Sequence, residues 1–71
     1  MQTVTPKQVA KERIRKWIQI ESIKNDVNQE DIARVLMTTQ SNISQKTKNG
    51  SFKAFEIVLL NQKLGFELSN I

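Results

Sequence analysis

Hydrophobic residues recur at helical spacing along most of the chain, and this pattern predicts an all-α fold. The first helix has the clearest start, because Thr5, followed by Pro6 at the first helical position and Gln8 at the third, forms a capping box. Its buried stripe is expected to contain Val9, Ala10, Ile14, Trp17 and Ile18. Trp17 shares this apolar face, which favours a place in the core over stacking on a nucleobase. The polar residues 21–27 form a connection, with room for an extra helical turn.

Two short helices joined by a tight turn are predicted over residues 28–50. Asn28 as N-cap, with Asp31 three residues further on, starts a helix over residues 29–36. Thr39 caps a second helix over residues 40–48, which leaves Met37 and Thr38 between the two. This arrangement is typical of a helix-turn-helix, which offers its second helix to the DNA major groove.

The second of these helices can turn a set of polar side chains outward. Ile43 points inward, and the small Ala33 of the first helix allows the two helices to cross closely. The outward positions are Gln40, Ser41, Ser44, Gln45 and Lys48. Gln can bond an adenine edge twice, Ser can bond several bases, and Lys can reach guanine or phosphate. The set therefore suits base reading, with Gln40 and Ser41 deepest in the groove, although an ordinary amphipathic surface helix also carries such residues outside.

Residues 28–50 resemble the helix-turn-helix of the Cro/CI, or XRE, family of bacterial and temperate-phage regulators. The residues that match its opening, small and core positions are Gln29, Ile32, Ala33, Leu36 and Ile43. The resemblance implies a λ-repressor-like domain of four or five helices that binds double-stranded operator DNA. It also implies that Gln40, Ser41 and Gln45 contact bases, and that Gln29 contacts phosphate and braces the second helix.

The chain departs from the family pattern at five places in this motif. Thr38 replaces a usual Val or Ile, and Gly50 comes one residue later than usual. Met37 stands where the family usually has a turn glycine, and a positive φ there would cost about 1 kcal/mol. Lys46 replaces an apolar residue, and Thr47 replaces a Glu that pairs with an Arg of the first helix in many members. We therefore expect the C-terminal half of the second motif helix to be frayed or shifted in register.

The last predicted helix is rich in apolar residues. Ser51 is expected to cap a helix over residues 52–63 that stops at Gly65, after which Phe66 folds back. Phe55, Val58 and Leu59 are expected to serve the core. The surplus that four small helices are not expected to cover consists of Ile57, Leu60, Phe66, Leu68 and Ile71. An uncovered apolar surface marks a protein contact, so we predict an interface at Ile57, Leu60, Phe66 and Leu68.

Basic charge is concentrated near the N-terminus of a chain whose net charge is +4. Residues 1–20 carry Lys7, Lys11, Arg13, Arg15 and Lys16 against Glu12 alone. The acidic first motif helix separates this cluster from Lys46, Lys48 and Lys53. The distribution predicts phosphate contacts from the first helix and from these three lysines, although a solvated helix face explains the first cluster equally well.

Length and composition set further limits on the function. Seventy-one residues form one domain, near the lower size at which a single core suffices. The chain has no Cys and no His, so no disulfide, ordinary zinc or iron site, or cofactor is expected, and no enzyme. It has no signal peptide and no long apolar run, so the cytoplasm is the expected location.

Two functions remain open, alone or combined. An operator-binding regulator, working as a homodimer, explains the motif and the basic charge. A protein that binds a cognate CI-type repressor explains the surplus apolar surface and the departures from the family pattern. The chain is similar in size and layout to temperate-phage modulators of repression, which are antirepressors of this second kind.

Overall fold

The structure, a computed structural model, describes residues 4–71, with the exception of the side chain of Asn70. It is built from helices: α1 (Pro6–Lys24), α2 (Gln29–Val35), α3 (Gln40–Asn49), α4 (Ala54–Leu64) and the short 3-10 helix η1 (Leu68–Asn70). Residues 4–71 contain no strand, so the predicted all-α fold of four helices is confirmed. Within this described part, no helix has the length and apolar character needed to cross a membrane.

Helix α1 begins where the capping box predicted. The hydroxyl of Thr5 accepts the N–H of Gln8 at 3.2 Å, and the Gln8 side chain accepts the N–H of Thr5 at 3.0 Å. The helix then continues through the extra turn allowed by the sequence and ends at Asn25. Asp26 turns the chain toward α2 with a positive φ of 54°.

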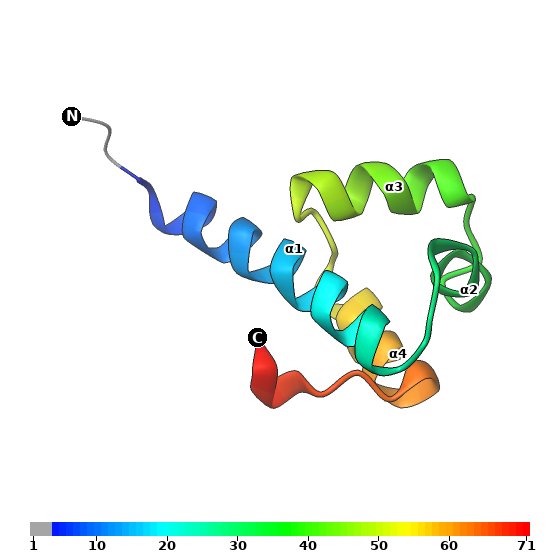
Figure 1. The fold of residues 1–71 in the computed structure, drawn as a ribbon. Coiled ribbons are helices and arrows are strands. Elements are labelled where there is room, and N and C mark those ends of the chain that lie inside the picture. The colour runs from blue at the N-terminus through cyan, green and yellow to red at the C-terminus, as the bar shows by residue number, and fades with distance from the viewer. Residues whose placement is uncertain (1–3) are drawn as a thin grey trace.

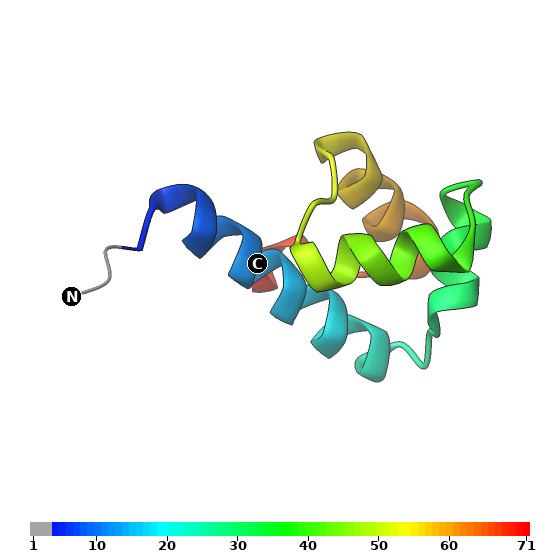
Figure 2. The same ribbon diagram turned by 90° about the horizontal axis from the view of Figure 1, so that it is seen from above.

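The N-terminal half of α1 projects beyond the other helices (Figures 1 and 2). A helix of 19 residues is about 28 Å long, whereas α3 with 10 residues is about 15 Å long. Residues 4–13 are all exposed because the shorter helices cover only the C-terminal half. The expectation that Val9 and Ala10 belong to the core is therefore wrong, and Val9 is 44% exposed.

Helices α2 and α3 start at their predicted caps. The Asn28 side chain accepts the N–H of Asp31 at 2.8 Å, and Asp31 accepts the N–H of Asn28 at 3.2 Å. Thr39 caps α3 through the N–H of Asn42 at 3.2 Å. In the turn between α2 and α3, Met37 has a φ of 55°. This is the positive φ whose cost for a residue other than glycine is given above.

Helix α3 is continuous to Asn49 and ends at Gly50, which has a φ of 61°. The expected fraying or register shift of its C-terminal half is therefore wrong. Two interactions of that half account for its order. Thr47 is buried against the rest of the domain, and the ammonium of Lys46 pairs with the carboxylate of Glu56 on α4.

The core lies where the C-terminal half of α1 meets the other three helices. Its buried hydrophobic members are Trp17, Ile18, Ile32, Ala33, Ile43, Phe52, Leu60 and Phe66. Trp17 and Phe66 pack edge to face, with ring centroids 5.5 Å apart and ring planes at 86°. Trp17 is a core residue, as its place on the apolar stripe predicted.

Helix α4 differs from its prediction in both start and orientation. Lys53, not Ser51, is the N-cap, because the carboxylate of Glu56 accepts the Lys53 N–H at 2.8 Å. Glu56 faces inward to meet Lys46, and this turns Leu60, one helical turn further on, into the core. Phe55 is consequently 61% exposed, so its predicted core role is wrong. The same rotation exposes Val58.

The C-terminal tail folds back onto the core and buries part of the predicted protein interface. Gly65 ends α4 with a φ of 76°, and the N–H of Phe66 reaches back to the carbonyl of Leu60 at 3.3 Å, as predicted. This fold-back buries Phe66 completely, and Leu60 is equally buried. Neither residue is available to a partner, so their assignment to an uncovered surface is wrong. Ile57 is half-buried against the core, and Leu68 remains exposed.

Candidate nucleic-acid interface

Helix α3 presents a polar outer face to solvent. Ile43 and Thr47 anchor the inner face of the helix in the domain. The exposed outer positions are Gln40, Ser41, Ser44, Gln45 and Lys48, the same set that the sequence predicts. The three residues expected to contact bases thus lie together on one side of a helix whose start is capped.

The N-terminal turn of α3 is braced by a side chain that the sequence did not single out. The Asn42 amide donates a 2.8 Å hydrogen bond to the hydroxyl of Thr38, while the Asn42 N–H bonds Thr39. Both bonds tie the turn to the start of the helix. Gln40 and Ser41 occupy this turn and stay exposed, so their side chains are free to meet a ligand on a fixed backbone.

Gln29 and Lys53 lie at the starts of their helices. Gln29 is the first residue of α2 and is half-buried, next to the cap formed by Asn28. Lys53 precedes α4 and keeps its side chain exposed, while its N–H is used by Glu56. Both residues therefore keep surface that a phosphate could approach, Gln29 near the start of the motif and Lys53 after its end.

Lys46 is placed differently from the other predicted phosphate ligands. Its ammonium pairs with Glu56, which is only 4% exposed. Burial alone would raise the pKa of Glu56, but the hydrogen bonds from Lys46 and from the Lys53 N–H, with the charges of both lysines, hold that pKa below its ordinary value. Lys46 is thus turned toward α4 and joins α3 to it.

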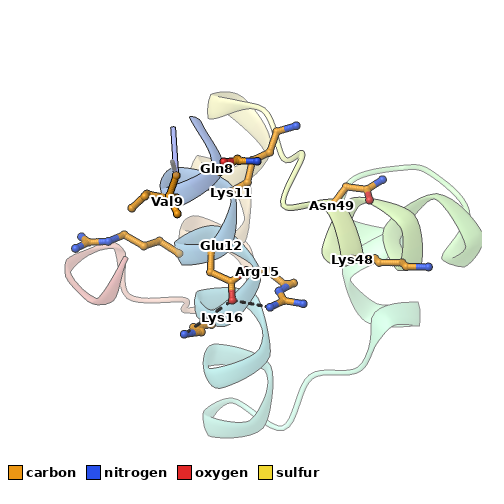
Figure 3. A pocket seen from close by; sticks show the side chains of 10 residues that line it. Gln8, Val9, Lys11, Glu12, Arg15, Lys16, Lys48 and Asn49 are labelled. Atoms are coloured by element: carbon orange, nitrogen blue, oxygen red, sulfur yellow. Dashed lines mark hydrogen bonds and ion pairs between the residues drawn. The ribbon is translucent and has the colours of Figure 1, made fainter. Parts of the chain in front are cut away.

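A basic groove lies between the N-terminal half of α1 and the C-terminal end of α3 (Figure 3). It is lined by Val4, Gln8, Val9, Lys11, Glu12, Arg13, Arg15, Lys16, Lys48 and Asn49. The carboxylate of Glu12 pairs with the guanidinium of Arg15 and lies 3.9 Å from the ammonium of Lys16. Lys11 and Arg13 are exposed, and the sequence marked them only through the net charge of the first 20 residues. The groove is therefore lined by five cationic side chains and by one carboxylate.

Gly50 brings the two walls of the basic groove together. A Cβ atom added at Gly50 would lie 2.1 Å from the carbonyl oxygen of Lys11, well inside contact distance. Only a glycine lets the end of α3 approach the backbone of α1 so closely, and the φ of 61° favours glycine as well. The position of Lys48 relative to Lys11 thus depends on this residue.

Comparison with protein-family models, with curated proteins and with solved structures finds no match to this chain. The geometry of α3, of the basic groove and of the exposed apolar residues therefore carries the functional interpretation.

Apolar side chains remain exposed on a different part of the molecule from the outer face of α3. Phe55 and Val58 are three residues apart on α4 and so lie on one helical face. Leu68 and Ile71 are exposed on the C-terminal tail. Of the four residues predicted to form a protein interface, only Leu68 is among these, because Ile57, Leu60 and Phe66 pack inward.

Proposed function

We propose that the protein is a small transcriptional regulator of the Cro/CI helix-turn-helix type, which binds operator DNA in a bacterial or phage genetic switch. The observation that carries this proposal is the outer face of α3, where Gln and Ser side chains are exposed on a capped helix that packs on α2. Five cationic side chains in the groove at the end of α3 supply the charge that a polyanion requires.

In this proposal α3 reads the bases, and residues outside α3 hold the phosphates. Gln40 and Ser41, in the first turn, enter the major groove and hydrogen-bond base edges, and Gln45 reaches a base one turn later. Gln29 and Lys53 bond phosphates on either side. Lys46 supports the helix through Glu56 and is not assigned a phosphate.

The test is a binding titration with DNA from around the protein's own gene, comparing Gln40→Ala with Gln62→Ala. Gln62 is an exposed Gln on α4, away from the proposed reading face, so it serves as a matched control. A good bidentate base contact contributes about 1–3 kcal/mol, so Gln40→Ala should weaken operator binding by roughly 5- to 150-fold. Equal affinity of both variants for the operator would show that Gln40 does not read bases.

A second candidate function, binding of a CI-type repressor, is favoured by the exposed pair Phe55 and Val58. Such a modulator would bind little DNA alone and change the repressor's complex with its operator. Phe55→Glu should then abolish the effect on the repressor, whereas Lys63→Glu, an exposed change further along α4, should leave it intact. A DNA complex formed by the protein alone, unaffected by Phe55→Glu, would favour the operator-binding regulator.

The two candidates also differ in assembly. An operator-binding homodimer would place two copies of α3 about 34 Å apart, one turn of DNA, and would require a palindromic site. A modulator would form a complex of two different chains. Sedimentation of the protein alone, and then with the repressor, separates these arrangements.

A further inference from the structure

One asparagine of the chain is directly followed by glycine. Asn49 and Gly50 form this pair, and every other asparagine precedes a larger residue. Asparagine is a labile residue, because the main-chain nitrogen of the next residue can attack the carbon of its side-chain amide. A glycine at the next position has no Cβ to hinder that attack. Position 49 is therefore the place in the chain where this reaction meets the least steric hindrance.

The side chain of Asn49 is also less restrained than those of the other described asparagines. Hydrogen bonds hold the side chains of all of these others, which are Asn25, Asn28, Asn42 and Asn61. Asn49 is exposed and lines the basic groove at the end of α3 (Figure 3). Its side chain makes no hydrogen bond with any residue that the structure describes. The Asn49 amide is thus free to turn toward the main chain of Gly50.

The main chain at the end of α3 sets one condition for the reaction. The N–H of Gly50 donates a hydrogen bond to the carbonyl of Lys46, and this bond must open before the nitrogen can attack. Asn49 is the last residue of α3, and the last turn of a helix opens more easily than its interior. The attacking nitrogen is most reactive as an anion, which the positive charge around the basic groove favours.

We propose that Asn49 is a site of self-modification, at which deamidation converts the asparagine into aspartate or isoaspartate. The nitrogen of Gly50 forms a bond to the side-chain amide carbon of Asn49. The bond between that carbon and the amide nitrogen breaks, and ammonia leaves. One water molecule then opens the resulting cyclic imide at either of its two carbonyl groups, which gives the two products. Nothing is oxidised or reduced, so water is the only co-reactant.

Both products change the contact between α3 and α1. Each replaces a neutral amide by a carboxylate at the C-terminal end of α3, where the helix dipole disfavours negative charge. Isoaspartate also inserts a methylene group into the main chain directly before Gly50. At Gly50 an added Cβ would already lie 2.1 Å from the carbonyl oxygen of Lys11, so there is no room for a longer main chain. Deamidation therefore loosens the end of α3 from α1 as the protein ages.

The test is incubation of the folded protein at mildly alkaline pH, followed by peptide mapping with mass spectrometry. Asn42 is the internal control, because it is exposed on the same helix but is hydrogen-bonded to Thr38 and precedes Ile43. We expect the mass increase of an amide converted to an acid at Asn49, at a rate proportional to the hydroxide concentration. Asn42 should keep its amide over the same period. Asn49→Gln should abolish the reaction at position 49, because its longer side chain would have to close a larger ring.

An Asn49 that stays intact in the folded protein would overturn the inference. Reaction at this position in the urea-unfolded chain alone would then show that the bond from Gly50 to Lys46 protects it. An earlier reaction at another asparagine would overturn it as well, because the free side chain of Asn49 would not be what selects the site.

A second measurement tests the effect on the contact between α3 and α1. Ion exchange separates the isoaspartyl form, and its thermal unfolding is compared with that of Asn49→Asp, which carries the charge without the added methylene group. The isoaspartyl form should have the lower melting temperature, since only its main chain is too long for the approach of Gly50 to Lys11. Equal melting temperatures would contradict the predicted loosening. Neither measurement depends on DNA binding, so the inference stands or falls separately from the proposed function.

Discussion

The indole N–H of Trp17 donates a 2.7 Å hydrogen bond to the main-chain carbonyl of Glu67, 50 residues further along the chain. The main-chain N–H of Glu67 donates a hydrogen bond to the carboxylate of the fully buried Glu21 at 2.8 Å. One peptide unit at each side of Glu67 is thereby fastened to α1. These two bonds hold Phe66 against the indole ring of Trp17, and the C-terminal tail thereby covers the core.

Replacement of Trp17 by Phe should destabilise the protein by about 2–4 kcal/mol. The change leaves the Glu67 carbonyl without its donor and opens a cavity beside Phe66. Urea denaturation followed by circular dichroism measures the loss, since the variant lacks the only Trp. Phe55→Leu, an exposed aromatic change, is the control and should shift stability by less than about 0.5 kcal/mol. A Trp17→Phe variant as stable as this control would show that the bond to Glu67 contributes nothing.

Gly50→Ala should be far more damaging than Gly65→Ala, although both glycines have positive φ. At Gly65 the nearest atom to an added Cβ is the Asn25 side chain at 3.4 Å, so only the backbone strain of about 1 kcal/mol is expected. At Gly50 the added Cβ meets the main chain of Lys11, and α3 must move away from α1. We expect a loss above about 2 kcal/mol in thermal or urea unfolding. Similar losses for the two variants would contradict the close approach of the helices.

Met37→Gly should stabilise the protein by about 0.5–1 kcal/mol. The side chain is 92% exposed, so its removal costs little packing, and Gly relieves the strain of a φ of 55°. Asp26→Gly is a useful comparison, because Asp tolerates this backbone region better and its φ is 54°. The gain at position 26 should therefore be smaller. A destabilised Met37→Gly variant would mean that the methionine makes a contact that outweighs its strain.

The ion pair between Glu56 and Lys46 should make stability depend on pH in the acid range. The pKa of Glu56 is lowered in the folded protein from an ordinary value of 4.5, so the unfolded chain binds the proton more readily. The contribution of the carboxylate is therefore fully present above about pH 5 and is lost as the pH falls through the folded-state pKa. The stability difference between wild type and Glu56→Gln should shrink between pH 5 and pH 3. Glu30→Gln, on the exposed face of α2, should show no such change; a constant difference for Glu56→Gln would refute the linkage.

Local sequence determined the starts and the ends of most elements. The caps at Thr5, Asn28 and Thr39 work within three residues of themselves, and Gly65 ends α4 through its own backbone conformation. The exposed set on α3 could be predicted for the same reason, because the inward position of Ile43 sets the opposite face of a short regular helix. The candidate base contacts follow from these local rules.

Only the tertiary structure decided which face of α4 is buried and how much of α1 is covered. A buried carboxylate is disfavoured until a partner is in place, so the sequence alone favoured Phe55 over Glu56 as an inward residue. Lys46, ten residues earlier, supplies that partner and reverses the choice. In the same way, the lengths of α3 and α4 relative to α1 leave Val9 exposed and create the basic groove. Capping acts between near neighbours in the chain, whereas burial depends on residues that only folding brings together.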